Sequence, residues 1–179
     1  MGYVVNGWNN VADNNKDKGV GFFGSFKPAG DNMTLVTNYL VGKESTGNAR
    51  HILDGIITYD ATSNVSVMAN YDYGMDKIGT ARQTWQGIAA YGKFSVPDTA
   101  VFSPRFEWFQ DRDGFMTGDA QEMKSFTATV QVPVNGATFW GEYRHDWSDA
   151  MVFPNETGFE DKQDTIVFGI TFDFMKEIR

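Results

Sequence analysis

Charged residues recur at every second position in two stretches of this chain, where they could select ions or form a network of ion pairs. One stretch contains Arg105 and Glu107, and the other contains Glu142, Arg144 and Asp146. In a β-strand, residues two apart point to the same face, so each stretch would present its charges together. Facing a water-filled lumen, they could form an ion-selective constriction. We favour a structural network that satisfies confined charges, and one network could serve both roles.

The remaining reactive side chains do not form a recognisable catalytic motif. His51 and His145 are the only histidines, there is no cysteine, and neither a G-x-S-x-G nor an H-E-x-x-H motif occurs. Neighbours in a strand point to opposite faces, so His145 cannot pair with the residue on either side of it. We expect no enzyme, unless a histidine meets a carboxylate from another strand.

Three aspartates, Asp111, Asp113 and Asp119, lie close together in a polar segment. They could bind a divalent cation, but aspartate is common in turns because its side chain bonds to nearby backbone amides. We favour the turn interpretation and expect neither a metal nor a cofactor.

The elements that would hold these charges are strands, because large apolar residues alternate with small or polar ones. Ile166, Phe168, Ile170, Phe172 and Phe174 show the pattern near the C-terminus. No helical periodicity competes over a comparable length. The alternation predicts ten strands, near residues 2–10, 18–27, 32–43, 50–60, 64–76, 84–96, 100–111, 121–132, 137–147 and 164–174.

Short and long connections alternate between these stretches. The short ones contain turn residues and fall at 28–31, 61–63, 97–99 and 133–136, whereas the others are longer and more polar. Short periplasmic turns and long external loops are typical of transmembrane barrels, and strands of about 9–11 residues cross a bilayer when tilted. We therefore predict an all-β, antiparallel, up-and-down transmembrane barrel over residues 1–174, followed by a tail at 175–179.

The charged face of such a barrel must line the lumen, because a Lys or Arg at the bilayer midplane costs about 2–4 kcal/mol. Carboxylates outnumber basic groups on this face, which predicts a mild preference for cations. The predicted pore-lining residues are Lys27, Arg50, Asp54, Asp72, Arg105, Glu107, Glu142, Arg144, Asp146 and Asp173.

The other face would carry aromatic belts at the two membrane interfaces. The alternative is a soluble, lipocalin-like barrel that binds a small ligand in an apolar interior, but so many bulky inward residues would overfill a small barrel. The predicted belt residues are Tyr59, Tyr71, Tyr73, Trp85, Tyr91, Trp108 and Tyr143.

Composition agrees with one membrane-embedded domain. The 179 residues include 15% aromatics at a mean hydropathy of -0.37, and no apolar run is long enough for a transmembrane helix. The net charge of -8 argues against nucleic acid as a partner. Residues Met1 to Asn6 do not resemble a signal peptide. A ten-stranded lumen should be restricted, so we expect a monomer in a lipid bilayer or detergent that passes small ions, or a scaffold with an occluded lumen.

Four segments resemble the OmpL-like family of β-barrel porins of bacterial outer membranes. The resemblance covers most of the chain and implies a membrane barrel in the outer membrane more strongly than it implies an activity. The segments are Val5-Asn6-Gly7-Trp8-Asn9-Asn10, residues 106–115, Glu142-Tyr143-Arg144-His145-Asp146-Trp147-Ser148 and Gln163-Asp164-Thr165.

Overall fold

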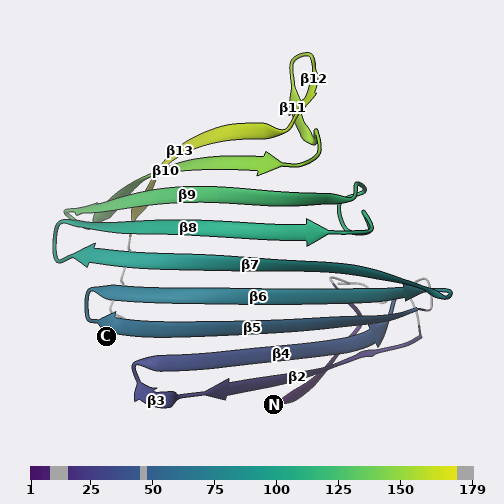
Figure 1. Ribbon diagram of the computed structural model, residues 1–179. Coiled ribbons are helices and arrows are strands. Elements are labelled where there is room, and N and C mark those ends of the chain that lie inside the picture. The colour runs from purple at the N-terminus through teal and green to yellow at the C-terminus, as the bar shows by residue number, and fades with distance from the viewer. Residues whose placement is uncertain (9–15, 45–47, 173–179) are drawn as a thin grey trace.

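The computed structural model describes residues 1–8, 16–44 and 48–172 and shows an all-β chain (Figure 1). Ten antiparallel strands form one sheet whose order follows the chain, so the predicted number of strands and the up-and-down topology are confirmed. The strands are β1 (Gly2–Val5), β2 (Gly19–Phe26), β4 (Met33–Lys43), β5 (Ala49–Thr62), β6 (Val65–Ile78), β7 (Ala81–Val96), β8 (Ala100–Asp111), β9 (Gln121–Val134), β10 (Ala137–Ser148) and β13 (Lys162–Phe172).

Three further short strands lie outside the main sheet. The strand β3 (Pro28–Asp31) occupies a segment predicted as a turn. That prediction is corrected in part: the segment begins as a short strand just after β2, but Gly30 has a φ of 68°, a conformation typical of turns. The strands β11 (Phe153–Asn155) and β12 (Gly158–Glu160) form a hairpin within the last long connection. Figure 1 shows this hairpin at the same end of the sheet as the connection between β8 and β9.

Among the connections that lie wholly within the described residues, all but one follow the predicted alternation of short and long. Asn135 and Gly136 join β9 to β10 with φ of 49° and 83°, as a two-residue hairpin turn of type I′ requires. The predicted long connection at 77–83 is wrong, because β6 and β7 continue pairing until only Gly79 and Thr80 remain between them. The residues outside strands at the other end are more numerous, for example 112–120.

The two faces of the sheet differ sharply. One face, here called the outer face, exposes large apolar side chains such as Phe106, Phe126 and Phe168. The opposite face, called the inner face, carries Arg105 and Glu107, which alternate with them. A soluble barrel with an apolar interior would bury these aromatic groups, so the lipocalin-like alternative does not fit. Buried apolar side chains within the described ranges are few: Ile52, Trp85, Ala89 and Phe153.

The strands are long for a small protein. From β4 to β10 they contain 11 to 16 residues, and about 9–11 tilted residues cross a bilayer. Strands β1 and β13 end the order of the sheet, and no pairing joins these two strands within residues 1–8 and 162–172. Asp173 and the tail at 175–179 lie outside the described residues. None of the described residues forms a helix with the length and hydropathy needed to cross a membrane.

Candidate ion pathway

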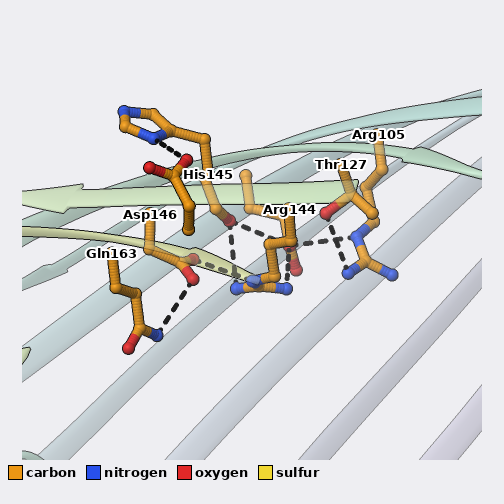
Figure 2. A network of polar contacts seen from close by, with 9 residues as sticks. Arg105, Thr127, Arg144, His145, Asp146 and Gln163 are labelled. Carbon is orange, nitrogen blue, oxygen red and sulfur yellow. Dashed lines mark hydrogen bonds and ion pairs between the residues drawn. The ribbon is translucent and has the colours of Figure 1, made fainter. Parts of the chain in front are cut away.

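A network of charged side chains on the inner face is centred on Glu107 of β8 and includes Arg105 and Arg144, which are labelled in Figure 2. One oxygen of this carboxylate, Oε2, accepts hydrogen bonds from Arg105 Nε, Arg144 Nη1 and Ser125 Oγ, each at 3.0 Å. Arg105 also reaches Thr127 Oγ1 on β9 at 3.3 Å. The pairing of β8 with β9 and of β9 with β10 therefore brings the two separate charged stretches of the sequence into contact.

Arg144 extends this network to β13. Its Nε donates to Asp146 Oδ1 at 2.8 Å and its Nη2 donates to Ser125 Oγ at 3.1 Å. The other oxygen of Asp146 accepts from Gln163 Nε2 at 3.2 Å, and this carboxylate is only 5% exposed. Since two guanidinium groups share two carboxylates, the positive charge of the network is compensated locally.

Glu142 lies on the same face of β10 as Arg144 and Asp146, but its contacts differ from theirs. Its Oε2 accepts a hydrogen bond from Thr129 Oγ1 at 2.7 Å, and no ion pair of Glu142 occurs among the described residues. The sequence did not indicate the contributions of Ser125, Thr127 and Gln163. Their positions opposite the charged residues depend on the register between strands, which the alternation within one strand does not fix.

A second cluster on the inner face is acidic. Asp54 of β5 and Asp72 of β6 lie directly opposite each other. Asp54 is bonded by amides and not by cations: Asn38 Nδ2 lies 2.9 Å from Oδ1, and Asn70 Nδ2 lies 2.8 Å from Oδ2. Two carboxylates facing each other repel, so this pair would favour a cation nearby.

A hollow of about 190 Å³ connects this acidic pair to the charge network. Both Asp72 and Glu107 belong to its lining, together with Gly87 and Ala89 of the intervening strand β7. The small side chains on β7 leave this space open between the two carboxylates. The geometry therefore offers a small compartment on the inner face in which Glu107 is paired with two arginines, whereas Asp72 has no cation partner among the described ion pairs.

Aromatic rings and one arginine gather on the inner face near the long connections. Arg50 Nη2 lies 2.8 Å from Asp76 Oδ2, and its guanidinium lies over the rings of Trp85 and Phe115 at 5.8 Å and 5.4 Å. Trp85 and Phe115 stack on each other with centroids 5.5 Å apart. Because Phe115 belongs to the connection 112–120, this connection folds onto the inner face.

Asp111 holds this connection in place. Its carboxylate is fully buried and accepts the backbone N–H groups of Phe115, Met116 and Thr117 at 3.0, 2.7 and 2.9 Å. Asp113 accepts the backbone N–H of Thr84 at 2.9 Å. The bonds of Asp111 are to nearby backbone amides, as the turn interpretation predicts, whereas the bond of Asp113 reaches strand β7.

The other predicted pore-lining residues divide as follows. Arg50, Asp54 and Asp72 lie on the inner face, whereas Asp173 lies outside the described residues. Lys27 lies apart from all of them, between β2 and β3, where it is solvent-exposed and bonded to Asp31 at 2.8 Å. The hydrogen bond and the charge of this ammonium hold the pKa of the Asp31 carboxyl below its usual value.

Two of the predicted belt residues face inward, which corrects their assignment. Trp85 pairs with Asp111, and Tyr91 pairs with Arg105, so both lie on the inner face. The outer positions of β7 are instead the even ones, including Ile88. The remaining belt residues lie on the outer face: Tyr59, Tyr71, Tyr73, Trp108 and Tyr143.

His145 meets a carboxylate from another strand, the arrangement that an enzyme would need. Its Nδ1 lies 2.8 Å from Asp164 Oδ1, which also accepts the Tyr143 hydroxyl at 2.6 Å. Figure 2 shows the imidazole on the opposite side of β10 from Arg144. On this outer face the adjacent position along β10 is Trp147, and the partner on β9 is Phe126. None of these neighbours supplies a serine or threonine nucleophile.

Comparisons with known proteins agree with this two-faced sheet. Residues 1–174 match the family described as putative beta-barrel porin-2, OmpL-like. The solved structure of NanC porin is similar in fold, with a TM-score of 0.59 and 16% sequence identity over 88% of this chain and 79% of NanC. No curated protein matches the chain.

Proposed function

Because the chain belongs to the OmpL-like family of β-barrel porins, we propose that it forms a narrow passive pore for small cations. The protein is a porin-like β-barrel of the bacterial outer membrane. The observation that carries the finer proposal is the hollow on the inner face lined by Asp72, which lies opposite Asp54 and, like it, has no cation partner in the described ion pairs.

Cation preference is supported by the unequal pairing of charges on the inner face. The guanidinium groups of Arg105 and Arg144 are already compensated by Glu107 and Asp146. Asp54 and Asp72 are not paired with any cation in the described ion pairs. A narrow lumen with low-dielectric walls strengthens this imbalance, although salt weakens it as the Debye length falls from about 10 Å at 0.1 M to about 3 Å at 1 M.

Two features support a small conductance: the number of strands, and the connection 112–120, which folds onto the inner face. Barrels of about eight strands are filled by side chains, and barrels of about 16–18 strands contain an aqueous channel. Ten strands therefore enclose little free space. The connection 112–120, which places Phe115 against Trp85, narrows it further. Ions should pass, while sugars and larger solutes should pass poorly.

The pore requires the two ends of the sheet to meet. An unpaired strand edge cannot face lipid, because its N–H and C=O groups would have no hydrogen-bond partners. We infer that β1 and β13 close the sheet within one copy, since ten strands are enough for a membrane barrel. The mass of the folded protein in detergent, measured by analytical ultracentrifugation, should be that of a monomer, and a dimer would contradict closure within one chain.

Single-channel recording in a planar bilayer tests the pore directly. Folded protein should produce small conductance steps that persist when sucrose is present on one side only. The double variant Asp54→Asn, Asp72→Asn is expected to insert and fold but to show a weaker preference for cations. If folded protein gives no conductance steps, the pore is rejected and the function reduces to a membrane scaffold with an occluded lumen.

A further inference from the structure

A polar cavity of about 340 Å³ lies on the outer face between β6, β7 and β8, at the end with the long connections. Its lining includes Arg82, Gln86, Gln110 and Arg112. Gln86 pairs with Gln110 on the same face as Trp108. Trp85, an inner-face position, also belongs to the lining, but the other strand positions in it lie on the outer face, so the cavity, here called the rim cavity, lies mainly on the outer side of the sheet.

The rim cavity is rich in positive charge. Arg82 lies directly opposite Lys77 in the pairing of β6 with β7, so a third cation adjoins the two arginines of the lining. No carboxylate belongs to the lining. Thr84, another lining residue, donates its backbone N–H to the carboxylate of Asp113. Within the described part of the chain, no ion pair is formed by Lys77 or Arg82.

The hydrogen bonds of the rim cavity leave most of the guanidinium donors available. Arg112 Nε donates to Gln110 Oε1 at 3.3 Å, and Gln86 Nε2 donates to the same oxygen at 3.1 Å. By contrast, Lys124 lies on the same face and at the same end but is bonded to Glu122 at 2.7 Å. The cations of the rim cavity thus differ from other outer-face cations in lacking a carboxylate partner within the lining.

Aromatic residues place the rim cavity at the depth of lipid headgroups. Tyr73 belongs to its lining, and the Tyr71 hydroxyl donates to Gln86 Oε1 at 2.9 Å. Tyrosine and tryptophan are enriched at the membrane interface, where the ring contacts the acyl region and the polar group faces water. Ile88, farther along β7, is apolar and exposed. Anionic groups at this depth are mainly the phosphates of lipid headgroups.

We propose that the rim cavity binds the phosphate of a lipid headgroup in the leaflet next to the long connections. The planar guanidinium groups of Arg82 and Arg112 each offer paired N–H donors that match two phosphate oxygens. The amides of Gln86 and Gln110 lie in the same lining. Binding would fix the lipid on the outside of the barrel, whether or not the lumen conducts.

Native mass spectrometry of the folded protein, released from detergent micelles, tests this site. Phosphatidic acid is the probe, phosphatidylcholine is the comparison lipid, and inorganic phosphate is the third ligand. The double variant Arg82→Gln, Arg112→Gln should lose phosphatidic acid binding by about tenfold or more, because each basic group near a membrane surface contributes about fivefold. Lys124→Gln, the matched control, should change binding by less than about twofold. Heat-modifiable gel mobility shows that each variant is folded.

The proposal is overturned if wild-type protein binds both lipids equally, or if the double variant binds phosphatidic acid as wild type does. It also fails if Lys124→Gln weakens binding as much as the double variant. Inorganic phosphate binding as tightly as phosphatidic acid would contradict the assignment to a lipid. Selective binding of phosphatidic acid that depends on Arg82 and Arg112 would support it.

Discussion

Replacing Asp146 by Asn should destabilise the barrel more than neutralising Glu142, the other carboxylate of the same strand. Both carboxylate oxygens are used, one by Arg144 Nε at 2.8 Å and the other by Gln163 Nε2 at 3.2 Å. The side chain is 5% exposed. An Asn at this position loses the charge and turns an N–H₂ group toward one of the two donors, which leaves that donor without an acceptor.

The expected cost follows from these contacts. A hydrogen bond to a charged group contributes about 1.5–3 kcal/mol, whereas breaking a buried ion pair costs about 3–5 kcal/mol. The larger range does not apply here, because Arg144 is 34% exposed and keeps its bonds to Glu107 and Ser125. We therefore expect Asp146→Asn to lower the free energy of unfolding by about 2–3 kcal/mol.

Glu142→Gln is the matched control, on the same strand and face. Glu142 accepts one hydrogen bond, from Thr129 Oγ1, and a glutamine oxygen can still accept it, so the cost should be about 1 kcal/mol or less. Urea unfolding in detergent micelles, followed by tryptophan fluorescence, measures both variants. If Glu142→Gln costs as much as Asp146→Asn, the reasoning from burial and bond number is refuted.

Three further predictions concern the pore and the short-turn end. Phe115→Ala removes the ring that stacks on Trp85, so the single-channel conductance should rise. Met116→Ala, in the same connection, should leave the conductance nearly unchanged. Equal conductances of the two variants would show that the Phe115 ring does not narrow the pore. Asp72→Asn should reduce the cation-to-anion permeability ratio about fivefold, because a unit charge about 8 Å away in water stabilises a cation and destabilises an anion by about 0.5 kcal/mol each; an unchanged ratio would remove Asp72 from the pathway. Lys27→Gln should return the lowered pKa of Asp31 toward its usual value, as an NMR titration of the carboxyl would record. In wild type the pair should stay intact above that usual value and be lost as pH falls through the lowered pKa, so a midpoint that is the same in both proteins would contradict the ion pair.

The strands could be predicted from the sequence because most of them carry apolar side chains on the outer face and polar or charged side chains on the inner face. Alternation over residues 121–132 and 137–147 is strong, and the corresponding strands β9 and β10 appear where expected. On β7 the predicted outward direction of Trp85 and Tyr91 is wrong, because apolar or aromatic residues occupy both faces of this strand. Trp85 and Tyr91 lie on the inner face, whereas Ile88 lies on the outer face. Where both faces carry similar side chains, alternation does not identify the side facing lipid.

The charge network could be predicted only in part. Arg105, Glu107 and Arg144 were recognised by their alternation, but their contacts with Ser125 and Gln163 depend on the register across β9 and β13. The inward fold of the connection 112–120 depends on side chains distant in sequence, which stack only after the sheet has formed. Local patterns contain no information about such contacts.

Reversal potentials across a KCl gradient in a planar bilayer test the central claim most directly. Wild-type protein should give a potential with the sign of a cation-selective pore at low salt, and the preference should fade toward 1 M as the Debye length falls to about 3 Å. A potential of the opposite sign, or one that is unchanged between low and high salt, would contradict the acidic inner-face pathway.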